Sequence, residues 1–217
     1  MRQLLLSAGV VSMALLGPAH ATIFTANLDI VSTANIGSGA LGTVTYTQNG
    51  AYEVDVDVSL IAGVEFVNSG GPHTPFVFNL DVSPVTVTIT SPGGNIFYPH
   101  AGGGSDTPYG WFNYAIYYSG QNGGGNGSAG PLDFKVTNAT GLSVNDFVAN
   151  AEGYYFAADV IGPNGGSGSI AANVVTDPPD PIVTNLLGPS EVPEPASFAL
   201  LGSALLSLGV MRRRKRR

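Results

Sequence analysis

Two histidines are the residues in the body of the chain best suited to acid–base or metal chemistry. His73 lies in a Gly-Pro-His-Thr-Pro segment, and His100 follows Pro99 just before a glycine-rich stretch. Imidazole changes its charge near neutral pH and binds metals, so each histidine is a candidate general base or metal ligand. Both contexts predict exposed loops, and neither histidine has the spacing of a nucleophile elbow, a zinc-protease motif or a phosphate-binding loop. The sequence therefore favours a protein that is not an enzyme. A secreted hydrolase stays an alternative, because paired carboxylates for glycoside hydrolysis leave no spacing pattern in a sequence.

Three acidic residues, Glu53, Asp55 and Asp57, alternate along one segment and are predicted to share one face of a strand. Neighbouring carboxylates on one strand face repel one another, and a bound Ca²⁺ ion would relieve that repulsion. An ordinary solvated strand face is the favoured alternative. Asp106, in a glycine-rich loop, is a second and weaker calcium candidate. No EF-hand pattern or calcium-binding repeat accompanies these residues, so the sequence assigns no cofactor and leaves Ca²⁺ as the one candidate.

Aromatic residues gather in residues 109–118, and exposed aromatic faces are what sugar-binding proteins offer to sugar rings. Strand alternation places Trp111, Asn113 and Tyr117 on one side, where they are candidate sugar contacts. The other side receives Phe112, Tyr114 and Tyr118. One of the two sides must belong to the core, so an ordinary covered surface is the alternative to a binding face.

The elements that would position these residues are strands. Residues 43–48 and 52–58 alternate between polar and apolar side chains around Asn49 and Gly50, which predicts a hairpin with a type I′ turn. On its second strand, Tyr52 is predicted to share the apolar face with Val54, Val56 and Val58. The predicted short helical turn, residues 143–148, begins at a cap formed by Ser143 and Asp146. The other predicted strands are residues 23–31, 64–67, 76–82, 85–90, 110–118, 132–137, 154–161 and 169–175.

Many short strands separated by turn residues predict an all-β fold, a single β-sandwich or jelly roll, over residues 22–176. These 155 residues suffice for one domain with a sizeable core. The chain has no cysteine, so the fold has no disulfides to support it. From Asp29 to Asp180 thirteen acids face a single cation, Lys135, which gives a balance of about −12. So acidic a domain is not suited to nucleic acid, whereas divalent cations and neutral surfaces are suitable partners.

The composition of the C-terminal segment predicts a membrane anchor that ends in basic residues. Pro193, Glu194 and Pro195 precede an uncharged stretch of 16 residues from Ala196 to Met211. As a helix this stretch would span roughly 24 Å, which is short for a hydrocarbon core of about 30 Å. Six consecutive basic residues follow this stretch and favour a cytoplasmic location for the C-terminus. Their long side chains can reach the membrane surface, which compensates for the short span. A buried core helix is the alternative, although six cations have no place in a core. They are Arg212, Arg213, Arg214, Lys215, Arg216 and Arg217.

The N-terminal segment predicts a cleaved signal peptide over residues 1–21. Arg2 supplies the positive start, residues 4–16 the apolar stretch, and Ala19, His20 and Ala21 a small-x-small cleavage site. An uncleaved membrane anchor is the alternative, but the apolar stretch is too short for one. The secretion translocon and signal peptidase are therefore expected partners.

The two ends together resemble bacterial PEP-CTERM proteins. The resemblance is carried by Val192, Pro193, Glu194 and Pro195, by the apolar stretch after them and by the basic cluster at the end. It implies that a membrane-embedded transpeptidase, exosortase, recognises the Pro-Glu-Pro residues and processes the tail. It also implies a Gram-negative bacterium that makes exopolysaccharide and a biofilm or floc matrix.

These features divide the chain into a signal peptide (1–21), a β-sandwich ectodomain (22–176), a proline-rich linker (177–191) and a sorting signal with a transmembrane helix (192–217). The expected function is that of a non-catalytic surface or extracellular-matrix protein, exported through the inner membrane. It would be held transiently with its basic tail in the cytoplasm and then released to the cell surface. The alternatives are a carbohydrate-binding module that acts on exopolysaccharide and, third, a secreted hydrolase.

Overall fold

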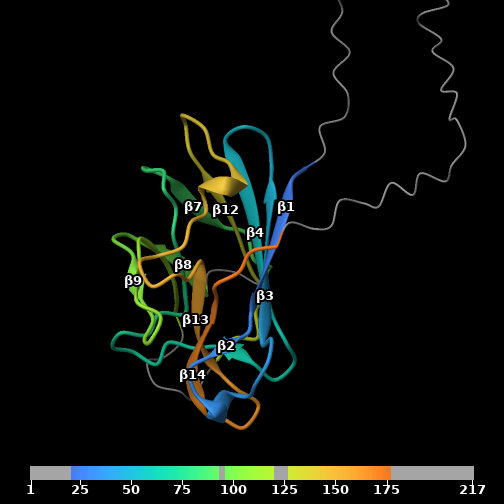
Figure 1. The fold of residues 1–217 in the computed structure, drawn as a ribbon, viewed down its shortest axis with the longest axis vertical. Helices are drawn as coiled ribbons and strands as arrows, with labels where there is room; N and C mark the ends of the chain where they lie inside the picture. The colour runs from blue at the N-terminus through green and yellow to red at the C-terminus, as the bar shows by residue number, and fades with distance from the viewer. Residues whose placement is uncertain (1–20, 93–95, 120–126, 177–217) are drawn as a thin grey trace, which may run out of the picture. The chain divides into compact units, whose positions relative to one another are not determined.

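We describe the protein from a computed structural model, which describes residues 21–92, 96–119 and 127–176 (Figure 1). The predicted signal peptide up to residue 20, the linker and the sorting signal with its transmembrane helix lie outside these residues. Within the three described ranges, no helix is long and apolar enough to cross a membrane.

The first sheet has five antiparallel strands in the order β1-β3-β4-β12-β7. Side chains alternate along it as the sequence predicts: Val54, Val56 and Val58 of β4 are buried, whereas Asp55 and Asp57 between them are exposed. This alternation shows that one face of the sheet is apolar and the other faces water. The strands are β1 (Ile23–Leu28), β3 (Gly42–Gln48), β4 (Glu53–Leu60), β12 (Leu132–Thr137) and β7 (Thr86–Ile89).

The second sheet has seven strands, six of them in the order β2-β14-β13-β6-β11-β8, with β5 also paired to β13. Its central strands are buried on both faces, as the all-buried pattern of β6 shows. The strands are β2 (Ile30–Val31), β14 (Ser167–Ala172), β13 (Phe156–Ile161), β6 (Phe76–Phe78), β11 (Tyr114–Tyr118), β8 (Phe97–His100) and β5 (Glu65–Phe66).

The apolar faces of the two sheets pack on each other and form the main core. Phe134 from the first sheet contacts Phe76 and Phe78 from the second, with ring centroids 5.9 and 5.3 Å apart. Tyr46 of β3 packs in the same way against Phe156 of β13 at 5.6 Å. The all-β fold is thus confirmed, and the two sheets form a sandwich.

A second, smaller core lies on the outer face of the second sheet. A two-stranded ribbon, β9 (Gly104–Ser105) and β10 (Trp111–Phe112), covers this face, opposite the first sheet in Figure 1. Gly103, just before β9, lets the two sides of the ribbon approach each other closely, because its φ is +75° and a Cβ there would overlap the Phe112 carbonyl of β10. The buried members of this outer core are Val77, Tyr109, Phe112, Ala115, Ala157 and Ala171.

The turn between β3 and β4 differs from the predicted one. The hairpin is present, with Gln48 opposite Val54, but the loop is longer than two residues and Asn49 does not adopt a positive φ; only Gly50 does, at +76°. A type I′ turn needs positive φ at both positions, so the predicted turn type is wrong. Tyr52 is also not on the buried face of β4, because it lies in the loop and is 56% exposed.

Elsewhere, a predicted strand is divided, two short strands are additional, and the predicted helical turn is present. The strand expected over residues 23–31 breaks at Asp29, because β1 joins the first sheet and β2 the second. Strands β8 and β9 were not predicted, since Pro99 and the glycines of this region argue against strands. The helical turn η2 (Val144–Asp146) is confirmed: Asn145 N–H donates to the Ser143 hydroxyl, and Ser143 N–H donates to the Asp146 carboxylate.

Candidate functional site

A cluster of buried polar side chains lies under the ribbon, on the outer face of the second sheet. Asp159 of β13 and Ser169 of β14 are directly opposite each other, and Asp106 lies in the loop that follows β9. All three are 0% exposed, whereas His73, from the segment between β5 and β6, keeps 32% of its side chain exposed. The cluster therefore has one solvent-facing member, the imidazole of His73.

Short hydrogen bonds connect the cluster into a group of three side chains and a separate pair. The Ser169 hydroxyl donates to Asp106 Oδ1 at 2.5 Å, and His73 Nδ1 lies 3.2 Å from that hydroxyl and 3.4 Å from the same carboxylate oxygen. The backbone N–H and the hydroxyl of Ser69 both donate to Asp159 Oδ2, at 2.7 and 2.5 Å. Together these bonds attach the segments around residues 69–73 and 106 to the sheet.

Burial governs the electrostatics of this cluster. It raises the pKa of Asp106 to about 7, although the hydrogen bonds from His73 and Ser169 favour the ionised form. The pKa of His73 is also raised, first by its hydrogen bond to Asp106. Burial raises the pKa of Asp159 as well. Asp106 Oδ2 and Asp159 Oδ1 are buried and have no hydrogen-bond partner among the described residues, so the charged form of each carboxylate is costly.

Serine, histidine and aspartate occur together here, but not in the arrangement of a catalytic triad. In a triad the serine hydroxyl gives its proton to one imidazole nitrogen while the carboxylate holds the other. In this cluster a single nitrogen, His73 Nδ1, faces both groups, and the Ser169 hydroxyl donates to Asp106 instead. Ser169 is also fully buried, so a substrate could not reach it. The chemistry that this geometry supports is proton sharing between Asp106 and His73.

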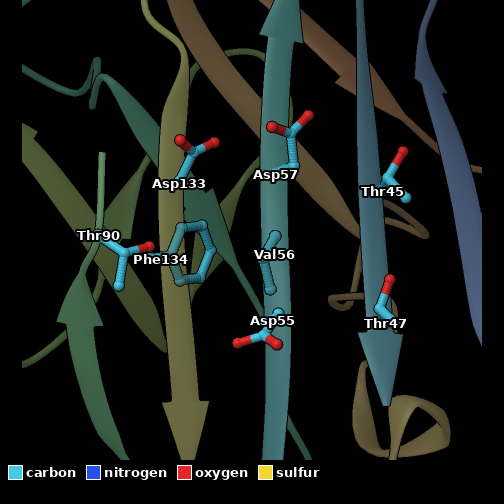
Figure 2. A pocket seen from close by; sticks show the side chains of 8 residues that line it. All are labelled: Thr45, Thr47, Asp55, Val56, Asp57, Thr90, Asp133 and Phe134. Atoms are coloured by element: carbon cyan, nitrogen blue, oxygen red, sulfur yellow. The ribbon is translucent and has the colours of Figure 1, made fainter. Parts of the chain in front are cut away.

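A second polar site is a shallow hollow of about 220 Å³ on the outer face of the first sheet (Figure 2). Asp57 of β4 and Asp133 of β12 are opposite each other, and Figure 2 shows their carboxylates side by side. Burial, and then the hydrogen bond and negative charge of Asp57, raise the pKa of Asp133 to about 6. The lining residues are Thr45, Thr47, Asp55, Val56, Asp57, Thr90, Asp133 and Phe134.

The hollow is lined by two of the three predicted calcium ligands, Asp55 and Asp57, whereas Glu53 is not among its lining residues. Glu53 forms an ion pair with Lys135 at 3.3 Å instead. Asn49 donates to both Glu53 and Asp55 at 2.9 Å, and Ser59 donates to Asp57 at 2.9 Å. Among the residues that the structure describes, no group of three or more histidine and acidic side chains is arranged to hold a metal ion. Asp106, the weaker calcium candidate, belongs to the buried cluster.

The predicted sugar contacts do not form one face. Asn113 falls in the break between β10 and β11, where its amide bonds both the N–H and the carbonyl of Leu80, at 3.1 and 2.7 Å. Trp111 lies on the ribbon and is 59% exposed. Tyr117 lies on β11 beside two aromatic residues of β8, Tyr98 and His100.

The expected grouping on the opposite side is also wrong. Phe112 belongs to the outer core, whereas Tyr114 and Tyr118 pack against the main core. The break at Asn113 is the reason, because strand alternation does not continue through it. His100 is likewise not in a loop but on the edge strand β8, with its side chain exposed.

Most of the buried cluster has no recognisable pattern in the sequence. Asp106 and Ser169 are 63 residues apart and His73 and Ser169 are 96 apart, so no local pattern connects them. One signal was available: Asp159 interrupts the apolar run Phe156–Ile161, and a carboxylate inside a buried strand requires buried hydrogen-bond donors.

Comparison with protein families identifies the C-terminal segment. Residues 191–216 match the family model described as the PEP-CTERM protein-sorting motif, which confirms the resemblance drawn from the sequence. Neither the curated proteins nor the solved structures gave a significant match to the chain. The motif indicates an exported protein that an exosortase-type system sorts to the cell surface.

Proposed function

We propose that this chain is a non-catalytic protein of the bacterial cell surface or extracellular matrix, sorted through its tail and associated with exopolysaccharide in a biofilm. The sorting motif at residues 191–216 carries this proposal. A tail of this kind delivers whatever domain precedes it, so the role of the protein depends on the sandwich.

The polar chemistry of the sandwich supports a role without catalysis. The Ser169 hydroxyl and the Asp106 carboxylate are buried and bonded to each other. Asp57 and Asp133 are directly opposite each other on β4 and β12, and Figure 2 shows their carboxylates side by side, whereas a glycosidase places its two carboxyl groups on either side of the bond that it cleaves. Both carboxylate sites are thus better suited to holding the fold together than to hydrolysis.

The export route follows from the two ends of the sequence. The translocon would carry the chain through the inner membrane, and signal peptidase would cleave after Ala21. The apolar stretch from Ala196 to Met211 would hold the chain with the cluster from Arg212 onward in the cytoplasm. Because that stretch is short for the bilayer, it suits a temporary hold until exosortase processes the tail.

Fractionation of cells that express altered tails tests the proposal. Replacing Pro193, Glu194 and Pro195 by alanine should leave the protein in the inner membrane at its unprocessed size, because the recognition residues are gone. The matched control replaces Pro178, Pro179 and Pro181 of the linker by alanine. We expect the control to reach the surface fraction like the wild type. Surface delivery of the altered motif at wild-type levels would contradict the proposed sorting.

A further inference from the structure

Three aromatic rings form a row on the outer face of the second sheet, at its edge. Tyr117 of β11 is opposite Tyr98 of the edge strand β8, and Ala115, two residues earlier on β11, is opposite His100. The ring of Tyr117 stacks on that of Tyr98 with centroids 6.1 Å apart, and the ring of His100 is tilted against it at 4.5 Å. We call Tyr98, Tyr117 and His100 the aromatic strip.

The strip is both exposed and firmly held. Tyr98 is 43% exposed and His100 is exposed beside it, so two of the three rings offer area to solvent. Tyr117 between them is partly buried, because it packs against the outer core. The angles between the ring planes are 30° for Tyr98 and 38° for His100, so the neighbouring rings lean on Tyr117 rather than standing edge-on to it. A ligand would meet rings that are already positioned, which lowers the ordering cost of binding.

The chemistry of the strip selects its partner. Ring faces attract the apolar faces of sugar rings, and the tyrosine hydroxyls and the histidine nitrogens can exchange hydrogen bonds with sugar hydroxyls.

Charge then decides between neutral and anionic polymers. Lys135 is the one Lys or Arg among the described residues; it lies on β12 of the other sheet and is paired with Glu53. An anionic polymer would therefore meet an acidic domain with no free cation at the strip.

We infer that the aromatic strip binds a neutral polysaccharide, which deepens, and rests on, the proposed role in the matrix. The strip replaces the predicted sugar face of Trp111, Asn113 and Tyr117 and retains only Tyr117 from it. Trp111 lies on the ribbon, and the Asn113 amide is already bonded to Leu80.

Affinity electrophoresis of the full chain in mild detergent tests the inference. The gels contain a neutral β-glucan, a neutral galactomannan or anionic alginate. We expect at least one neutral polymer to retard the wild type and alginate not to. Tyr98→Ala should weaken the retardation about tenfold, and Tyr98→Trp, which keeps a ring, should retain it. Tyr52→Ala is the matched control, since Tyr52 is an exposed tyrosine in the turn between β3 and β4.

Several results would overturn the inference: no retardation by either neutral polymer, the strongest retardation by alginate, or equal losses in Tyr98→Ala and Tyr52→Ala. Loss in Trp111→Ala with none in Tyr98→Ala would assign binding to the ribbon instead. The electrophoresis does not depend on sorting in the cell. If the strip does not bind polysaccharide, the fractionation result is unaffected. If the tail is not sorted, the electrophoresis result is unaffected.

Discussion

Replacing Asp106 by asparagine removes a buried carboxyl group whose ionisation the fold resists. The carboxyl accepts hydrogen bonds from Ser169 and His73 through Oδ1, while Oδ2 is buried without a partner among the described residues. Asparagine has nearly the same shape and cannot ionise. The substitution therefore tests the electrostatics of the cluster with little change in packing.

The expected magnitude follows from the pKa of Asp106, which is raised from 3.8 to about 7. A raised pKa means that the folded protein holds the proton more tightly than the unfolded chain, so stability is lost as pH rises from about 4 through 7. The full pKa difference corresponds to a change of about 4 kcal/mol in the free energy of unfolding. Because the site can relax around the charged group, we expect a change of about 2 to 4 kcal/mol. The raised pKa of His73 adds a further loss in the same direction, starting above pH 6.5.

Urea unfolding of the full chain at several pH values between about 4 and 8 measures this effect. The free energy of unfolding of Asp106→Asn, relative to the wild type, should rise by about 2 to 4 kcal/mol from the acidic to the basic end of that range. Asp29→Asn removes an exposed carboxylate and controls for the change in net charge. If the profiles of Asp106→Asn and the wild type run parallel, the argument from the buried carboxyl is refuted.

Three further substitutions test other parts of the account. Asp133→Asn removes a carboxyl whose pKa is raised to about 6; because this group is partly exposed, solvent screening reduces the effect, and the substitution should stabilise the protein by about 1 to 2 kcal/mol at pH 8 and hardly at pH 4 in urea unfolding. Gly103→Ala should lower the melting temperature, and should lower the free energy of unfolding by about 2 kcal/mol or more, because a Cβ would overlap the Phe112 carbonyl at a positive φ; a wild-type melting temperature would contradict the close approach of the two sides of the ribbon. Phe134→Ala should cost about 3 to 5 kcal/mol in urea unfolding, since this 1% exposed ring fills the space between the sheets, and a cost below about 1 kcal/mol would argue against the sandwich core.

Local pattern predicted the first sheet well. The alternation of Val54, Asp55, Val56 and Asp57 reflects a strand with one face in the core and one in water. This pattern is visible in the sequence because it involves only neighbouring residues. The cap of η2 was predictable for the same reason, because Ser143 and Asp146 are three residues apart.

The second sheet was harder to predict, because its environment is set by distant segments. The ribbon covers the outer face of this sheet, so β6 is buried on both sides and shows no alternation. Whether residues 23–31 form one strand or two depends on β14, which pairs with β2 some 140 residues further along the chain. The hydrogen bonds of Asp106 to His73 and Ser169 likewise form only once both sheets are in place.

Mass spectrometry of the mature C-terminus tests most directly whether the tail sorts the sandwich to the surface. We expect the surface-fraction protein to lack residues 196–217 in cells with an active exosortase and to keep them where that enzyme is deleted. An intact C-terminus ending at Arg217 in the surface fraction of exosortase-positive cells would contradict it.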